Sequence, residues 1–179
     1  FLGINQVQVR EDIGLTFAAA LRSILRQDPN IIMIGEVRDF DTVDIAIKSA
    51  LTGHLVLSTL HTTTSAGAIV RLVNMGVEPY LINSALICVI GQRLVRKVCP
   101  YCREKYTLKK EIADSLKLKI AEPVFYKAKG CPQCFNTGYK GRIAISEVLL
   151  LSLKVRELIL AHAQEHVIKQ QARLEGTRT

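Results

Sequence analysis

The sequence predicts an α/β domain, then a small cysteine-rich module, then a closing segment with one strand and two helices. Up to about residue 95, short apolar runs alternate with amphipathic stretches of helical period, which is typical of an α/β sheet. Two Cys-Pro-x-Cys turns follow, and such paired cysteines favour a metal site. The predicted divisions are residues 1–97, 98–141 and 142–179.

The composition is that of a folded domain. Of the 179 residues, 49% are hydrophobic and 22% are charged, which excludes a disordered chain. The apolar stretch 81–91 is too short to span a bilayer. No signal peptide is visible, and because the chain starts at Phe1 we expect its native start to lie upstream. Cys88 lies in an apolar run and is expected to be a buried thiol in a reducing compartment.

The formal net charge of +8 favours phosphates, nucleic acid or an acidic membrane surface as partners. Much of this charge is local, because seven basic residues and one acidic residue lie between Arg93 and Lys110. Four thiolates around a divalent zinc would bring the net charge nearer +6. Charge alone therefore does not choose between these partners.

Periodicity predicts the elements of the first part. Residues 4–9 alternate apolar and polar side chains, which predicts a half-buried strand. Residues 16–27 carry a helical apolar stripe, and Asp28 before Pro29 ends that helix. The uninterrupted apolar run 31–35 is typical of a central parallel strand.

The next helix has two candidate N-caps, Asp39 and Asp41. Its expected core face consists of Val43, Ala46, Ile47 and Ala50. This helix is expected to end at Thr52-Gly53. The remaining predicted elements, in chain order, are a strand over 55–57, a helix over 65–75 ended by Gly76, a strand over 143–151, and helices over 154–161 and 167–174.

The cysteine pairs have the spacing of metal ligands. Cys99 and Cys102 form one turn, Cys131 and Cys134 the other, and residues 103–130 separate them. Four thiolates can hold a tetrahedral zinc at about 2.3 Å. Because sulfur would fill every position, the metal is expected to be structural. A redox pair is the alternative for one such turn, but two matching turns favour zinc.

Polar side chains follow two of the predicted strands. Glu36 comes directly after the first, and His61 shortly after the second. Ligands bind at the carboxyl ends of parallel strands, where a carboxylate can hold Mg²⁺ or its water ligands near phosphates. His61 could contact the terminal phosphate. The alternatives are a surface pair of Glu36 with Arg38, and ordinary polar strand ends for His61 and His54.

Arg22 and Arg26 lie one helical turn apart and away from the apolar stripe of their helix. Such a pair usually belongs to a solvated helix face. The alternative is a pair offered to a neighbouring subunit, as an arginine finger is.

Together these segments resemble the secretion-ATPase superfamily, specifically the type II secretion and type IV pilus assembly ATPases. Residues 3–9 resemble the segment after that family's acidic box, residues 21–39 its Walker B region, and residues 51–62 its histidine box. Residues 93–96 lead into a tetracysteine motif, as in assembly-type members. The resemblance implies the second half of a RecA-like P-loop ATPase domain, with a tetracysteine zinc module and C-terminal helices.

The resemblance also implies roles for the site residues. Glu36 would be the Walker B glutamate, His61 a phosphate-sensing histidine and His54 a second candidate, while Arg22 and Arg26 would reach nucleotide across a subunit interface. The parent would be a homo-hexamer that uses ATP and Mg²⁺. It would lie on the cytoplasmic face of the bacterial inner membrane and drive pseudopilin or pilin assembly through a membrane platform protein. No specific nucleic-acid partner is expected.

The chain departs from the family's pattern in several places. Thr63 stands where asparagine is usual, and Ala144 and Ser146 replace glycine and tyrosine. No Gly-x-x-x-x-Gly-Lys-Ser/Thr loop occurs in the 179 residues, nor does the acidic box. The sequence is therefore expected to be a piece of the ATPase that does not hydrolyse ATP alone.

Two other functions remain open from the sequence. One is a zinc-ribbon module that binds nucleic acid through the basic cluster between Arg93 and Lys129. The other is a protein-docking module without catalysis. The sequence also leaves open whether the parent serves secretion, pilus growth or DNA uptake.

Overall fold

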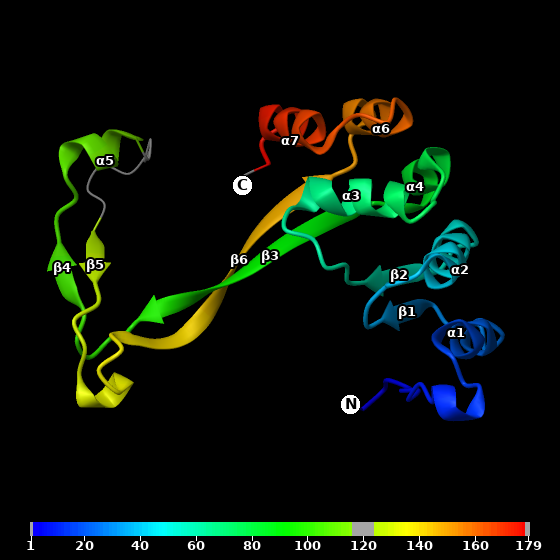
Figure 1. The fold of residues 1–179 in the computed structure, drawn as a ribbon, viewed down its shortest axis with the longest axis horizontal. Coiled ribbons are helices and arrows are strands. Elements are labelled where there is room, and N and C mark those ends of the chain that lie inside the picture. Colours follow the sequence, from blue (N-terminus) through cyan, green and yellow to red (C-terminus); the bar gives the residue numbers. More distant parts are fainter. Residues whose placement is uncertain (1, 116–123, 178–179) are drawn as a thin grey trace. The chain divides into compact units, whose positions relative to one another are not determined.

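The computed structural model describes residues 2–115 and 124–177. Their contacts divide the chain into two compact units, residues 1–91 with 147–179 and residues 92–146, here named the core unit and the cysteine unit. Among the described residues, no helix has the length and apolar character needed to cross a membrane. The elements of the first part (Figure 1) are η1 (Glu11–Ile13), α1 (Phe17–Leu25), β1 (Ile31–Ile34), α2 (Phe40–Leu51), β2 (Leu55–Ser58), α3 (Ser65–Asn74) and α4 (Pro79–Ala85).

The later elements include those of the cysteine unit. They are β3 (Cys88–Val98), β4 (Glu104–Tyr106), α5 (Lys110–Ser115), β5 (Phe125–Lys127), η2 (Pro132–Cys134), β6 (Tyr139–Leu150), α6 (Leu153–Leu160) and α7 (Glu165–Leu174). Periodicity predicted most of the helices, but it missed α4, α5, β3, β4 and β5. Four of these elements are too short to show a period, and the longer β3 does not alternate apolar and polar side chains.

β1 and β2 form a parallel pair in which Ile31 faces Leu55 and Ile34 faces Ser58. Side chains of β1 alternate, so that Ile32 and Ile34 are buried whereas Ile31 and Met33 are exposed. The prediction of a central parallel strand is therefore wrong for the described residues, in which β1 has one strand neighbour and one exposed face. Successive side chains of a strand point to opposite faces, and in this chain the helices cover only one of them (Figure 1).

The structure confirms the predicted N-cap of α2 and shows a further cap at the start of α1, which the sequence analysis did not predict. Thr16 accepts the Ala19 amide at the start of α1, at 3.2 Å. Asp39 accepts the Thr42 amide at the start of α2, at 2.8 Å, whereas Asp41 lies inside the first turn.

The buried face of α2 is rotated from the predicted one. Val43 and Ala46 are buried as expected, but Ile47 and Ala50 are only half-buried. The remaining buried positions of the helix are Thr42, Ile45 and Ser49. Ser49 is tolerated there because its hydroxyl donates to the carbonyl of Ile45, at 2.6 Å.

The predicted strand over residues 4–9 is wrong. The structure shows no regular element there, and the chain then forms a single bridge between Arg10 and Leu15 that encloses η1. Alternation alone does not make a strand, because its amide and carbonyl groups need a neighbouring strand, and none of the described residues supplies one to this segment.

A single hydrophobic cluster holds the core unit together. It gathers side chains from both ends of the chain, and its largest fully buried members are Ile34, Ile69, Ile82, Leu149, Val155, Ile159 and Ile168. Burying one such side chain contributes about 1.5–3 kcal/mol. The segment after β6 is therefore an integral part of the fold that carries β1 and β2.

The cysteine unit has almost no apolar interior. β4 and β5 form a short antiparallel pair, in which Glu104 faces Lys127, and β3 pairs with β6 in a separate two-stranded sheet. Among the unit's described hydrophobic side chains, only Cys99 and Cys134 are buried.

Candidate functional site

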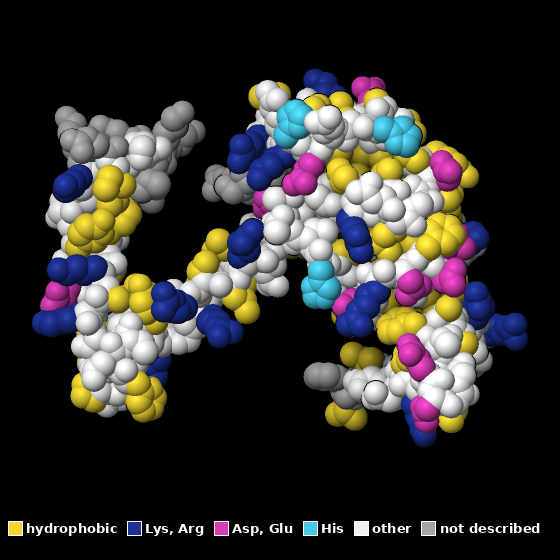
Figure 2. All heavy atoms as spheres, viewed as in Figure 1, with side chains coloured by type: hydrophobic (Ala, Val, Ile, Leu, Met, Phe, Trp, Pro, Cys, Tyr) yellow, Lys and Arg dark blue, Asp and Glu magenta, His cyan; other side chains and the backbone are white. Residues whose placement is uncertain are grey.

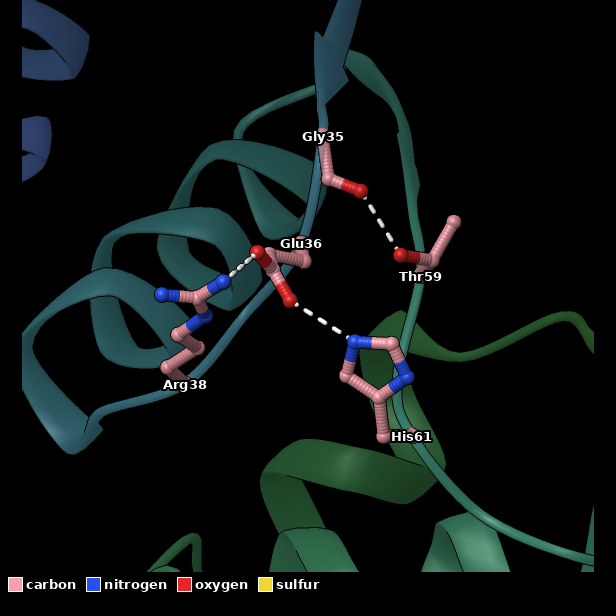
Figure 3. Close-up of polar contacts among 5 residues, drawn as sticks. All are labelled: Gly35, Glu36, Arg38, Thr59 and His61. Carbon is pink, nitrogen blue, oxygen red and sulfur yellow. Dashed lines mark hydrogen bonds and ion pairs between the residues drawn. The ribbon is translucent and has the colours of Figure 1, made fainter.

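The parallel register brings the ends of β1 and β2 to one edge. Past the strands the pairing continues, because Val37 donates its amide to the carbonyl of Thr59 at 3.1 Å and the Thr59 hydroxyl donates to the carbonyl of Gly35 at 2.6 Å. Figure 3 shows how the Thr59–Gly35 bond holds the two segments side by side. Glu36 and His61 extend from them toward each other.

Glu36 lies between an imidazole and a guanidinium (Figure 3). Its Oε2 is 2.9 Å from Nε2 of His61, and its Oε1 accepts a hydrogen bond from Arg38. The Glu36 side chain is 27% exposed and that of His61 is 87% exposed. Both groups are thus open to a ligand, with the carboxylate the more enclosed of the two.

The neighbours of Glu36 favour its charged form. The hydrogen bond from Arg38 lowers the pKa of this carboxyl below its usual value against the opposing effect of desolvation, and His61 adds to the lowering. Glu36 therefore remains a carboxylate at neutral pH. Such a group can accept protons from bound water or ligate a divalent cation.

The other predicted nucleotide residues do not meet at this edge. Nδ1 of His54 lies 3.0 Å from the carbonyl of Ser49, before β2, whereas His61 follows that strand. Arg22 and Arg26 are exposed at the C-terminal end of α1, and neither makes an ion pair or side-chain hydrogen bond with any other described residue.

An open pocket of about 530 Å³ adjoins the imidazole. It is lined by His61, Thr62, Thr63, Gly67, Val70, Arg71, Asn74 and Glu165. Arg71 and Glu165 were not predicted as site residues. Arg71 has the pattern of an ordinary cation on an amphipathic helix, and Glu165 is a hundred positions from the loop it contacts, so neither gives a local signal.

The four paired cysteines converge in one cluster. Their sulfurs all lie within 4.8 Å of one another, with Cys99 to Cys131 at 4.0 Å, Cys102 to Cys134 at 3.9 Å and Cys131 to Cys134 at 3.7 Å. Sulfurs at about 2.3 Å from a tetrahedral zinc would be about 3.8 Å apart. A disulfide needs about 2.05 Å. The spacing therefore fits a four-sulfur metal centre.

Backbone amides also point at these sulfurs. Gly130 donates to Sγ of Cys102 at 3.3 Å, and Gly138 donates to Sγ of Cys134 at 3.2 Å. Burial raises the pKa of the Cys134 thiol, but the amides of Cys131 and Gly138 outweigh it and bring the pKa to about 6. A thiolate is the form that binds a metal.

Comparison with known proteins identifies the family of this chain. The type II/IV secretion system protein family matches residues 1–179. The chain is 49% identical to the type II secretion system ATPase E of Vibrio cholerae over 96% of its length, and 49% identical to the type IV pilus assembly ATPase PilB of Myxococcus xanthus over 96%. It spans about a third of these relatives, 34% and 31%.

A solved structure of similar fold is that of the pilus retraction motor PilT with bound ADP. It is 27% identical, has a TM-score of 0.63, and the match covers 98% of this chain and 44% of that one. The ATPase DotB of Legionella pneumophila is also 27% identical, with a TM-score of 0.55, 88% of this chain and 34% of that one. Since the family match extends over the whole sequence, the chain belongs to the type II/IV secretion system protein family.

Proposed function

We propose that this chain carries the Walker B and histidine part of the ATP site of a hexameric ATPase that drives pseudopilin or pilin assembly. The observation that supports it most is the 2.9 Å contact between Glu36 and His61 at the carboxyl edge of a parallel strand pair. The relatives named as secretion and pilus assembly ATPases, and the PilT structure with ADP, point to the same chemistry.

In this proposal Glu36 acts on water and His61 on phosphate. The Glu36 carboxylate is suited to accept a hydrogen bond from a water molecule that Mg²⁺ holds, because its side chain is ionised. Mg²⁺ prefers oxygen ligands and usually keeps several waters. Mg²⁺ would supply charge neutralisation at the phosphates when bound. Once His61 turns from Glu36 to a terminal phosphate, Oε2 is free to accept a proton from the attacking water.

Arg22 and Arg26 are proposed to act between subunits. Both are exposed on α1 and have no partner among the described residues, so an anionic group of a neighbour can reach them. Arginine in such a place stabilises charge in phosphoryl transfer. His61 is preferred over His54 as the sensor, because the ring of His54 is held at the end of α2.

The cysteine cluster is proposed to hold a structural zinc. Cys99, Cys102, Cys131 and Cys134 supply four sulfurs at the right spacing, and no position remains for a reacting water. We place the parent ATPase on the cytoplasmic face of the inner membrane, where it would engage a platform protein and other components of the assembly system.

The decisive experiment is Glu36→Gln in the full-length ATPase. We expect phosphate release to fall by about 100-fold or more, since the amide cannot act as a base, while nucleotide binding and the hexamer persist. Glu157→Gln is the matched control, because Glu157 is a glutamate of α6 with no side-chain partner among the described residues. Unchanged turnover in Glu36→Gln would remove Glu36 from the mechanism.

A further inference from the structure

Carboxylates from the last part of the chain anchor the segment that carries His61. Three residues after His61, the hydroxyl of Thr64 donates to Oε1 of Glu165 at 2.5 Å. One residue further, the amide of Ser65 donates to Oε1 of Glu147 at 2.5 Å. These glutamates come from α7 and β6, 101 and 82 positions away in sequence. The loop between β2 and α3 is therefore tied at its end by tertiary contacts.

The Glu147 contact has the features of a built anchor. Ser65 is 3% exposed, and its amide is one of the donors at the start of α3 that have no acceptor within the helix itself. A negative charge there is favourable to the helix. Burial raises the pKa of Glu147, but the hydrogen bonds from Ser65 and the charges of Lys169 and Arg173 outweigh it. The net pKa is lowered, so the anchor is charged at neutral pH.

Gly91 makes room for this side chain. A Cβ at position 91 would lie 2.8 Å from Cγ of Glu147 and 3.0 Å from its Oε1. Real Cβ atoms do not come so close to a neighbour, so even alanine would force Glu147 to move. β3 and β6 belong to the same two-stranded sheet, and a missing side chain on one strand lets a carboxylate of the other reach α3.

We propose that Glu147 is a positioning residue for His61, and that Gly91 is required for it. By fixing the amide of Ser65, Glu147 sets where α3 begins. The start of α3 in turn sets the direction in which the loop between β2 and α3 presents the imidazole of His61 to Glu36. Glu165 reinforces the same point through Thr64. This inference rests on the proposed function, in which His61 contacts the terminal phosphate and must therefore point in a defined direction.

The test is a double-mutant cycle in the full-length ATPase with Glu147→Ala and Gly91→Ala. We expect Glu147→Ala to lower kcat by about tenfold, as for loss of a hydrogen bond to a charged group, with KM for ATP within about twofold. Gly91→Ala should give a similar loss, and the double variant should lose no more than either alone. Glu147→Gln keeps a carbonyl acceptor and should restore most of kcat.

Hydrogen exchange supplies a readout that does not depend on hydrolysis. Amides of residues 59–66 should exchange at least about tenfold faster in Glu147→Ala and Gly91→Ala, and should stay protected in the control Glu157→Ala. A normal kcat, or unchanged exchange at 59–66, in Glu147→Ala would overturn the proposal. If the decreases in kcat of the two single variants multiply in the double variant, Gly91 does not act through Glu147. Full turnover in Glu36→Gln, together with faster exchange of residues 59–66 in Glu147→Ala, would instead refute the proposed function. The role of Glu147 in holding the loop would then remain supported.

Discussion

The two units of this chain reach order by different means. The core unit buries a cluster of aliphatic side chains from both ends of the chain, whereas the described part of the cysteine unit buries little besides Cys99 and Cys134. A unit without an apolar core needs another source of free energy, and a metal centre is one that small modules use. With the proposed zinc site, this chain would divide its stability between burial of apolar side chains and metal coordination.

The two units also differ in net charge. Residues 92–146 contain 13 Lys and Arg and four Asp and Glu, for a net charge of +9, so the rest of the chain carries −1. Figure 2 shows Lys and Arg side chains spread over the part of the molecule that holds β4 and β5. Some of these cations lie over aromatic rings, as Arg96 does over Tyr139 at 4.0 Å and Arg103 over Tyr126 at 4.3 Å. The cysteine unit thus uses part of its charge in its own packing.

The largest expected effect follows from removing the proposed zinc site of the cysteine unit. Cys134→Ser in the full-length protein should abolish zinc content, measured by elemental analysis. It should also expose the amides of the described cysteine unit to exchange, because structural zinc is worth about 10–16 kcal/mol. Amides of α4 and α6 should stay protected. Cys88→Ser, outside the cluster, is the control, and full zinc content in Cys134→Ser would contradict the four-sulfur centre.

The reverse experiment weakens the apolar cluster. Ile82 is fully buried in it, so Ile82→Ala should lower the local free energy of unfolding of α4 and α6 by about 2–5 kcal/mol. The measurement is denaturant-dependent hydrogen exchange of those helices. Ile90→Ala serves for comparison, because Ile90 is 61% exposed. If zinc is released at the same denaturant concentration in Ile82→Ala as in the parent, the units are independent; an earlier release would show that they are coupled.

A smaller effect concerns the charge of Glu36. Since Arg38 lowers the pKa of this carboxyl, Arg38→Ala should raise it. A protonated Glu36 cannot act as a base, so the acid limb of the kcat/KM profile should move to higher pH. The ion pair between Glu36 and Arg38 stabilises the fold at pH values above the pKa of Glu36 in the unfolded chain. This stabilisation is lost as the pH falls through the lowered pKa of Glu36 in the folded chain. Lys48→Ala, which breaks the exposed pair with Asp44, should leave the profile in place; an identical shift there would argue against a local cause.

The smallest expected effect tests a helix cap. Asp39→Ala removes the acceptor for the Thr42 amide and should cost about 1 kcal/mol in the exchange stability of α2. Asp41→Ala changes a carboxylate in the same turn that is not the N-cap. Equal losses in the two variants would mean that charge near the helix start matters and the cap does not.

Several features could be predicted locally. The helices α1, α2 and α3 follow from the apolar period, with a cap predicted for α2 and terminal glycines for α2 and α3. The cysteine turns follow from their spacing. Residues 4–9 mislead because alternation reports a preference for extended backbone and carries no information about a partner strand. The burial of β1 on one face only likewise depends on what packs against it.

By itself, the sequence determined most of the helices, the parallel strands β1 and β2, the four-cysteine set, and the polar residues placed after these two strands. Only the tertiary structure decided that Glu36 meets His61, that His54 does not join them, and that Glu147 and Glu165 tie the His61 loop from far along the chain. The reason is physical: caps and turns depend on neighbours in sequence, whereas a site depends on which strand edges and helix ends the packed core brings together.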